Sequence, residues 1–344
     1  MRLYELTDAN RHRWDAWLGG QPTSTVFHCT AWRDIIAETL RHQPVYLVAQ
    51  AGEEIQGVLP LFILRTRLFG NMAVSMPFLN YGGVVAAQEE AAEALMRRAR
   101  EVAERYGCNY VEYRHRHLPP GTEDLPTNTF KVTSILDLSG GVERVWKEAL
   151  HQNVRNKVRK AAKNDVVVRR GVEHLDAFYR VFAVGQRNHG TPVLPRRFFA
   201  KIVEQFGDAA HVYAAYHGAE AIGGKLTIDF GSTRYFIWSA SRREANRMAP
   251  VPAMNWRAIQ DAVDIGLQTV DFGRSTQGTS SEKFKKHWGV ETQQLYWQYQ
   301  LIHTEQMPGL NTSNPKFELA IRAWKKLPVW LTTLIGPPLA RLLP

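Results

Sequence analysis

The residues from 266 to 289 combine side chains that could hold and polarise an anionic or polar ligand. A short apolar run ends at Gly273, and a loop of Thr, Gln, Gly and Ser follows it. The stretch closes with a cationic and aromatic cluster made of Lys283, Phe284, Lys285, Lys286, His287 and Trp288. Loops at strand ends commonly carry binding and catalytic groups. The alternative is a solvated lysine-rich turn, because charge runs usually form solvated faces.

Two charged residues lie where the predicted strand of this stretch ends. Asp271 has a carboxylate that could orient an attacking amine, and Arg274 has a guanidinium that can bind a phosphate or carboxylate at two points. The alternative for both is a structural ion pair with each other across Gly273, since such pairs also occur at strand ends.

Further polar residues could contact a substrate: Asn80, Tyr81, His189, Ser239 and Asn255. Asn80 and Tyr81 precede two glycines and could equally serve turn formation. His189 could act as a base, although a single loop histidine is more often a surface residue. Ser239 lies on a predicted central strand, and Asn255 opens a helix beside the strand that carries Asp271.

Residues 142–162 carry apolar side chains at a spacing of 3.6, which predicts one amphipathic helix. Its second half and the residue that follows are basic: Arg155, Lys157, Arg159, Lys160 and Lys163. We expect this face to dock a polyanion or a membrane; as a contact with tRNA it would give strongly salt-dependent binding. A solvated helix face is an equally open interpretation.

The elements that would position these residues occur in the same order in both halves of the chain. Each half contains helices, a β-hairpin, another strand, a helix and a final pair of strands. The sequence therefore predicts two related α/β (α+β) domains with mixed central sheets, at residues 1–140 and 141–303, followed by a proline-rich tail at 304–344.

Charge and composition limit the partners and the compartment. The 344 residues have a formal net charge of +10, which favours an anionic partner such as nucleic acid, a phosphorylated substrate or a membrane surface. Two cysteines, Cys29 and Cys108, are too few for a disulfide framework, and no apolar signal segment opens the sequence. We expect a cytoplasmic protein, and a peripheral contact with the inner face of the membrane stays open.

The tail contains an amphipathic segment followed by an apolar one. Its apolar positions are Phe317, Ala320, Ile321, Trp324 and Leu327, flanked by Arg322, Lys325 and Lys326. The next segment, PVWLTTLIGPPLARLLP, is too short and too interrupted by proline to span a bilayer. Residues 316–344 could lie in the plane of a membrane surface, or pack on the protein's own core or on a second subunit.

Several motifs, in order along residues 20–302, resemble the FemAB-like proteins of the GNAT superfamily. They are VLPLF, SMPFLNYGG, VRNKVRKA, GTPVLP, VDFGRS and FKKHWG. The resemblance implies two GNAT-like domains in tandem. It is greatest to the branch associated with exosortase/PEP-CTERM and exopolysaccharide loci.

Fem transferases move an amino acid from aminoacyl-tRNA onto an amine of a peptidoglycan precursor. Their F-K-x-x-(F/W)-G motif matches Phe284, Lys285, Trp288 and Gly289. The resemblance implies that Lys285 contacts the acyl donor or the oxyanion that forms in the reaction. The chain departs from the family because it has no long helical arm for tRNA. It also departs from acetyl-CoA-dependent GNAT enzymes, because the turn at residues 247–252, RMAPVP, lacks their glycines.

These observations predict an acyl or aminoacyl transferase that acts on a cell-envelope or exopolysaccharide precursor. An amine or hydroxyl of the acceptor would attack an activated acyl donor directly, with Lys285 and Asp271 as catalytic groups. No metal and no tightly bound cofactor is expected, and the donor is either aminoacyl-tRNA or acyl-CoA. A CoA-dependent N-acyltransferase, and a non-catalytic basic scaffold for anionic glycan, RNA or membrane, are the alternatives.

Overall fold

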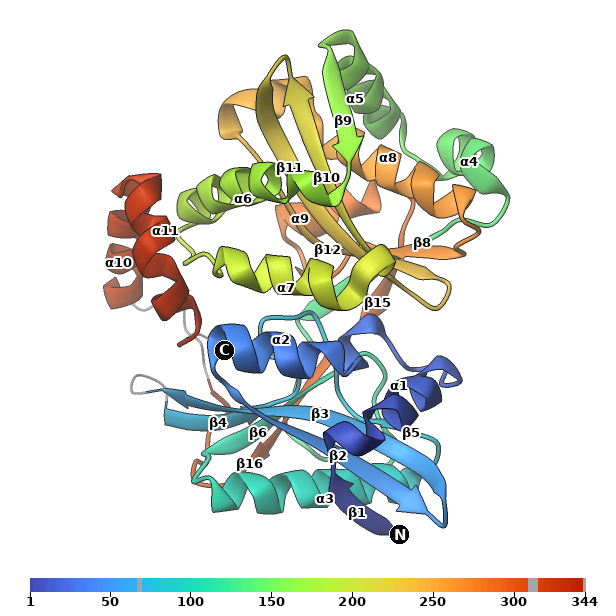
Figure 1. The fold of residues 1–344 in the computed structure, drawn as a ribbon, viewed down its shortest axis with the longest axis vertical. Helices are drawn as coiled ribbons and strands as arrows, with labels where there is room; N and C mark the ends of the chain where they lie inside the picture. Colours follow the sequence, from blue (N-terminus) through green and yellow to red (C-terminus); the bar gives the residue numbers. More distant parts are fainter. Residues whose placement is uncertain (67–69, 309–314, 343–344) are drawn as a thin grey trace. The chain divides into compact units, whose positions relative to one another are not determined.

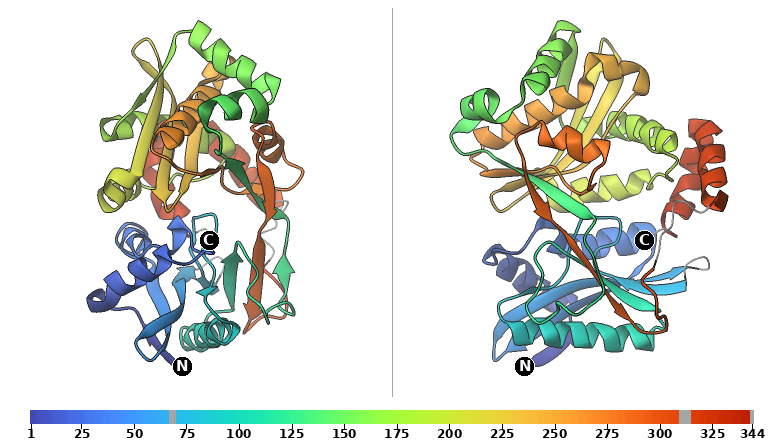
Figure 2. Two further views of the ribbon diagram at one scale, coloured as in Figure 1. Left: turned by 90° about the vertical axis from the view of Figure 1, so that its right-hand side faces the viewer. Right: turned by 180° about the vertical axis from the view of Figure 1, so that it is seen from behind.

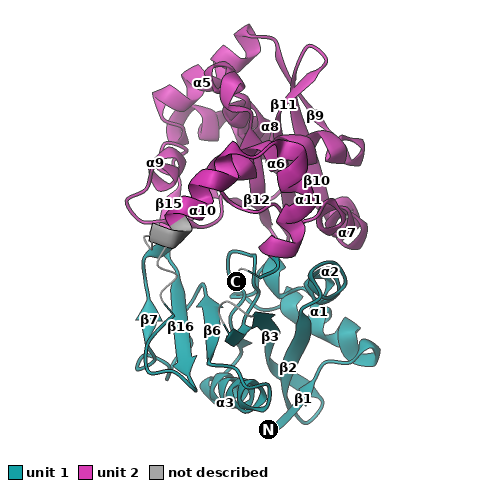
Figure 3. Cartoon of the chain, turned by 90° about the vertical axis from the view of Figure 1, so that its left-hand side faces the viewer, with its two compact units in different colours: residues 1–132, 294–310, 341–344 teal, residues 133–293, 311–340 magenta. Residues whose placement is uncertain are grey.

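Residues 1–66, 70–308 and 315–342 are described by a computed structural model of the chain, with the backbone alone at 315–317 (Figure 1). The side chain of Phe317, the linker at 309–314 and the last two residues, which belong to the predicted tail, lie outside that description. The chain forms two compact units, coloured separately in Figure 3. Unit 1 contains residues 1–132, 294–310 and 341–344, and unit 2 contains residues 133–293 and 311–340.

Unit 1 is built on a mixed sheet with the strand order β1-β2-β3-β4-β6-β16-β7, and β5 pairs with β3. The strands are β1 (Arg2–Glu5), β2 (Gln43–Ala51), β3 (Glu54–Thr66), β4 (Gly70–Val74), β5 (Val85–Ala86), β6 (Tyr110–His115), β7 (Thr127–Asn128) and β16 (Tyr296–Leu301). Its helices are α1 (Arg11–Gly19), α2 (Ala31–Leu40) and α3 (Glu89–Arg105). The apolar positions of α3, among them Leu95, Ala99 and Val102, pack on β2 and β3 to form the core.

Unit 2 contains a second mixed sheet with the order β14-β8-β13-β12-β11-β10-β9, and β15 pairs with β8. Its strands are β8 (Lys131–Asp137), β9 (Val166–Arg170), β10 (Ala210–His217), β11 (Glu220–Phe230), β12 (Thr233–Ser241), β13 (Thr269–Asp271), β14 (Ser275–Thr276) and β15 (Glu291–Gln294). The helices are α4 (Gly141–Arg144), α5 (Gln152–Lys163), α6 (Leu175–His189), α7 (Arg196–Phe206), α8 (Pro250–Asp264), α9 (Ser280–Lys286), α10 (Pro315–Lys326) and α11 (Val329–Ala340).

Helices cover both faces of the second sheet. Neighbouring residues of a strand point to opposite faces, and a Cβ atom on Gly223 would meet Met254 of α8, whereas one on Gly224 would meet Phe178 of α6. Figure 2 shows α8 in orange and α6 in yellow-green on opposite sides of the strands. The expected class, two mixed-sheet α/β domains, is confirmed.

The expected domain boundaries at residues 140 and 303 differ from these units because two strands are exchanged. β8, expected as the last strand of the first half, pairs with β13 in the sheet of unit 2. β16, expected in the second half, pairs with β6 in the sheet of unit 1. An apolar alternating segment shows that it is a strand, but it does not show which sheet it joins.

The prediction of a single helix over residues 142–162 is wrong, because the helix is interrupted at Leu150 and His151. A short turn, Val145–Ala149, ends there, and α5 begins with the His151 side chain accepting from the Asn153 amide. Arg155 holds the break by donating to the carbonyl oxygens of Trp146, Lys147 and Leu150. Arg155 therefore caps the preceding turn.

Among the described residues, no helix combines the length and the apolar character that crossing a membrane requires.

Candidate active site

The catalytic candidates meet where β12 and β13 separate. These two parallel strands pair only from Thr233–Thr269 to Tyr235–Asp271, and β12 then continues to Ser241 paired with β11 but not with β13. A register shift opposite Leu226 and Thr227 places one extra residue in β12 at this point. The backbone of β12 beyond Tyr235 therefore has no partner on β13, which ends at Asp271.

The carboxylate of Asp271 is held at the end of β13 and is 1% exposed. Its Oδ1 accepts hydrogen bonds from the Gly273 amide at 2.7 Å and from the Thr133 hydroxyl at 2.8 Å. Its Oδ2 has no hydrogen-bond partner among the described residues. Burial raises the pKa of Asp271 to about 7.

Lys285 on α9 approaches the same turn, and its side chain is largely buried. Its Nζ donates to the carbonyl oxygens of Gly273 at 2.7 Å and of Arg274 at 2.9 Å. Burial lowers the pKa of Lys285 to about 8, opposed by the nearby charge of Asp271. The Gly273 N–H thus donates to Asp271, and the Gly273 carbonyl oxygen accepts from Lys285. Gly273 has a φ of 74°, a backbone conformation that favours glycine.

α9 is held in place by contacts at both ends. Glu282 accepts from the Gly278 amide at 2.6 Å and pairs with Lys286 at 2.8 Å. Trp288 is fully buried and contacts the rings of Phe272 and Phe284. The loop predicted at residues 276–281 is in part a helix start, because α9 begins at Ser280.

This arrangement can stabilise negative charge on a carbonyl oxygen. An ammonium has three N–H bonds, and two of those of Lys285 are used by the two backbone carbonyls. The third is available for an oxygen that becomes negative during acyl transfer, and Asp271 supplies a carboxylate that can accept a proton.

A second buried lysine, Lys225, was missed by the sequence analysis. It lies on β11, is 2% exposed, and its Nζ stands 3.6 Å from the ring centroid of Phe236. Burial and the charge of Lys285 hold the pKa of Lys225 well below its ordinary value. The signal was present in the sequence: a single lysine inside the apolar run of a central strand.

A pocket of about 400 Å³ opens between α5 and the start of α8, and we call it the α5–α8 pocket. Its cationic residues are Lys157, Lys160 and Arg247, and no acidic residue lines it. Phe284, the neighbour of Lys285 in sequence, lines the same pocket. The pocket therefore offers an anionic group a binding place that is lined in part by α9, the helix that carries Lys285.

The start of α8 is poorly suited to the pyrophosphate of CoA, which GNAT enzymes bind with backbone amides at a helix start. Pro250 and Pro252 have no amide hydrogen, and the amide of Ala253 already donates to Ala249. The cations of the α5–α8 pocket suit a phosphate bound by side chains instead.

The remaining predicted residues of unit 2 are dispersed. Asn255 on α8 is buried and its Oδ1 has no partner among the described residues. Ser239 and Lys163 are exposed, and His189 is exposed at the end of α6. The guanidinium of Arg159 lies over the Trp146 ring. Of the five basic residues proposed for docking, Lys157 and Lys160 line the pocket.

In unit 1, Asn80 and Tyr81 belong to a constrained loop. Met76 and Phe78 adopt positive φ values of 56° and 69°, and such strain is often found at functional sites. The buried Arg114 fixes the loop by donating to the carbonyl oxygen of Met76 at 3.3 Å. Asn80 is half-buried, whereas Tyr81 is fully buried and its hydroxyl has no partner among the described residues.

A second residue on β6, His115, was also missed. Both of its ring nitrogens are buried without a hydrogen-bond partner among the described residues. A Cβ atom on Gly83 would come within 2.1 Å of its Nδ1, so the SMPFLNYGG motif needs glycine at this position. Burial lowers the pKa of His115 to about 3, which keeps the ring neutral.

Part of the chain matches a known domain family, and the fold is similar to that of several solved structures. Residues 149–286 match the acetyltransferase (GNAT) domain family. No sequence among curated proteins matches significantly. The chain is similar in structure to FemX, with a TM-score of 0.66 at 16% identity over 88% of this chain and 98% of that one.

Two further solved structures are similar. One is the C-terminal domain of a putative lysylphosphatidylglycerol synthetase from Agrobacterium fabrum, with a TM-score of 0.57 at 10% identity over 87% of this chain and 93% of that one. The other is a tandem GNAT protein from the clavulanic acid biosynthesis pathway, with a TM-score of 0.50 at 14% identity over 89% and 99%.

The chain therefore has a tandem GNAT-like fold similar to that of FemX, and residues 149–286 within it match an acetyltransferase (GNAT) domain. Its mixed sheets flanked by helices have the arrangement of these structures.

Proposed function

We propose that the protein transfers an acyl or aminoacyl group from an activated donor to a cell-envelope or exopolysaccharide precursor. The observation that carries the proposal is the buried ammonium of Lys285, fixed on two carbonyl oxygens at the end of β13 beside Asp271. A rigid cation at such a place can stabilise the oxyanion of an acyl transfer.

The reaction proceeds by direct attack. The lone pair of the acceptor nitrogen or oxygen forms a bond to the carbonyl carbon, and the carbonyl oxygen becomes negative against Lys285. The bond from that carbon to the leaving oxygen or sulfur then breaks. The proton of the acceptor passes to Asp271 and from there to the leaving group, so that charge and protons balance.

The donor is proposed to carry a phosphate that lies in the α5–α8 pocket. Lys157, Lys160 and Arg247 supply the charge, and Arg274 is a further candidate for an anionic substrate group. The prolines at the start of α8 favour aminoacyl-tRNA over acyl-CoA as the donor. FemX and the lysylphosphatidylglycerol synthetase domain are similar in fold, which is compatible with an aminoacyl donor.

Asn80 and Tyr81 of unit 1 stay candidate substrate contacts. His189, Ser239 and Asn255 stay candidate substrate contacts. We place the reaction on the cytoplasmic side of the inner membrane with the protein peripheral to it, and the exopolysaccharide branch of the FemAB-like proteins remains our proposal for its context.

The test supplies each donor class separately to the purified protein with envelope precursors extracted from its source cells. Aminoacyl-tRNA carrying labelled amino acids and labelled acyl-CoA are the two donors, and label in the precursor is the readout. We expect transfer from aminoacyl-tRNA, reduced about 100-fold or more in Lys285→Met, the scale of one lost oxyanion donor.

The matched control is Lys283→Met, since Lys283 lies on the exposed side of α9. Absence of transfer from both donors would contradict the proposal, and so would a Lys285→Met variant as active as the control. Transfer from acyl-CoA alone would support the N-acyltransferase alternative instead.

A further inference from the structure

The last two helices of unit 2, α10 and α11, form a hairpin beside α6 (Figure 1). One side of α11 is buried: Thr332, Gly336 and Ala340 recur every four residues and are largely inaccessible. Gly336 lies against Val193, and a Cβ atom on it would meet the Val193 backbone at 3.1 Å. The hairpin is therefore docked on its own unit through this side.

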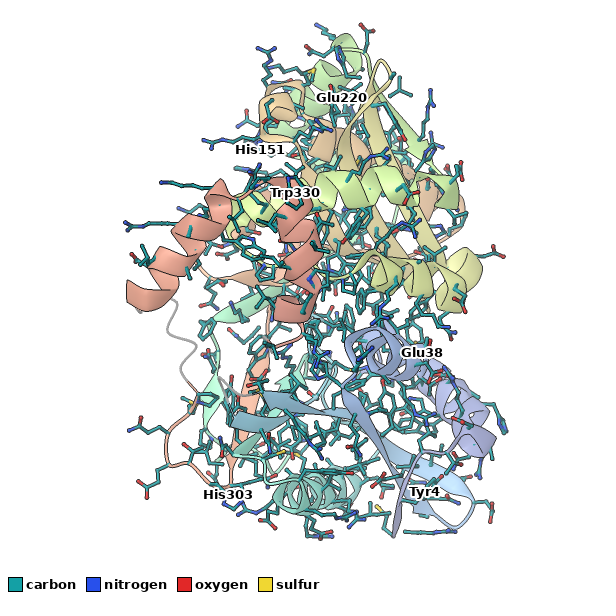
Figure 4. All side chains as sticks on the ribbon, turned by 60° about the vertical axis from the view of Figure 1, so that its left-hand side comes forward. Tyr4, Glu38, His151, Glu220, His303 and Trp330 are labelled. Atoms are coloured by element: carbon teal, nitrogen blue, oxygen red, sulfur yellow. The ribbon has the colours of Figure 1, made fainter. Side chains whose placement is uncertain are left out.

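The opposite side of α11 is apolar and exposed. Trp330 is 68% exposed and Leu334 is 67% exposed, and Figure 4 labels Trp330 on this helix. Residues two positions apart on a helix point in nearly opposite directions, so this side faces away from Thr332 and Gly336. We call Trp330 and Leu334 the α11 ridge.

The α11 ridge is a candidate interaction surface, because large exposed apolar side chains that lie side by side mark such surfaces. Isolated surface leucines need no explanation. Here a tryptophan and a leucine stand one turn apart on a helix that carries no charged residue from Val329 to Ala340.

The neighbouring helix supplies positive charge. Lys325 and Lys326 at the end of α10 are exposed, and so is Arg322. The one acidic residue of α10, Glu318, pairs with Arg322 at 3.1 Å. A basic helix end beside an apolar ridge complements a surface that is apolar inside and anionic at its rim.

We propose that the α10–α11 hairpin docks on a membrane containing anionic lipids. Trp330 and Leu334 enter the boundary between headgroups and acyl chains, and Lys325 and Lys326 contact lipid phosphates. A second copy of the chain fits less well, because a symmetric contact through the ridge would bring the lysines of both copies together. The α11 ridge and the two lysines thereby form the surface through which the protein contacts the membrane. This part of the inference rests on the peripheral location within the proposed function.

The experiment measures cosedimentation of the full-length protein with vesicles of phosphatidylcholine, alone or mixed with phosphatidylglycerol. We expect binding to the mixed vesicles, with a blue shift of Trp fluorescence. Trp330→Ser/Leu334→Ser should lower the affinity at least about tenfold, from the apolar area that no longer enters the bilayer. Lys325→Glu/Lys326→Glu should remove the preference for anionic lipid, because each lysine contributes about a fivefold increase in affinity for an anionic surface.

Two control variants carry matched changes elsewhere in unit 2. Val167→Ser/Val172→Ser alters two other exposed apolar residues, and Arg243→Glu reverses one other exposed cation. Both should bind like the unaltered protein, and circular dichroism should show the same helix content for all variants.

Equal binding to both vesicle types, or undiminished binding of Trp330→Ser/Leu334→Ser, would overturn the inference. So would a dimer in sedimentation equilibrium that Trp330→Ser/Leu334→Ser dissociates while vesicles stay unbound. These outcomes leave the transfer proposal intact, because transfer to a solubilised precursor depends on Lys285 and not on the ridge.

Discussion

Replacing the buried Lys225 by an uncharged residue should raise the stability of the fold and lower the transfer activity. The side chain is almost fully buried on β11, and the group facing its ammonium is the Phe236 ring. A buried cation without a carboxylate partner costs stability. Lys225→Met keeps the length of the side chain and removes the charge, so we expect the variant to be more stable than the unaltered protein near neutral pH.

The size of the effect follows from the lowered pKa of Lys225. Between that lowered value and the ordinary lysine value of about 10, the unfolded chain binds a proton that the folded chain does not. The stability of the unaltered protein therefore falls by up to about 1.4 kcal/mol for each unit that the pH falls in this window. The methionine variant lacks this contribution.

The assay is urea unfolding followed by Trp fluorescence at several pH values. Below about pH 9.5, the stability advantage of Lys225→Met should grow by up to about 1.4 kcal/mol for each unit that the pH falls toward the lowered pKa. Lys283→Met, a change at an exposed lysine, is the control and should show no such dependence. Transfer should fall in Lys225→Met, because Lys225 lies within the electrostatic reach of Lys285.

An advantage that does not change with pH, or a variant less stable than the unaltered protein, would refute the reasoning. Either result would mean that the Lys225 ammonium is well solvated or paired in the folded state.

Two further predictions concern the transfer reaction. Activity should be bell-shaped in pH: it falls below about 7 as Asp271 takes up a proton and above about 8 as Lys285 loses one, and Asp271→Asn should remove the acid limb. A pH-independent rate would exclude these two groups. Lys157→Ala/Lys160→Ala should raise KM for a phosphate-bearing donor about tenfold and weaken the salt dependence of binding, with kcat little changed. Lys163→Ala, whose exposed side chain lies outside the pocket, should leave KM as it is; equal effects of both changes would contradict a pocket-specific contact.

The sequence predicts the fold class well because apolar periodicity reports which segments are strands and helices. It does not predict the exchange of β8 and β16, since pairing partners depend on contacts far apart in the chain. The sequence also does not predict the interruption of the helix at Leu150, because the apolar periodicity continues across it. Arg155 stabilises the interruption by donating hydrogen bonds to three backbone carbonyl oxygens.

The candidate site shows the same limit. Motif matching selects Lys285 and Asp271, and in the structure both side chains form hydrogen bonds with the backbone of Gly273. Lys225 lies on a different strand and belongs to no motif, so motif matching passes over it, and its position over the Phe236 ring is visible only in the structure. The pocket combines Lys157 with the start of α8, a proximity that the two separate segments could not show.

The strand exchange has a consequence for how the chain is made. β6 acquires its neighbour β16 only after all of unit 2 up to Gln293 has been synthesised. Until then β6 presents an open edge that could pair with other chains. β16 therefore pairs with β6 only at a late stage of synthesis. A chain whose synthesis ends within unit 2 would have a first unit in which β6 still lacks this neighbour.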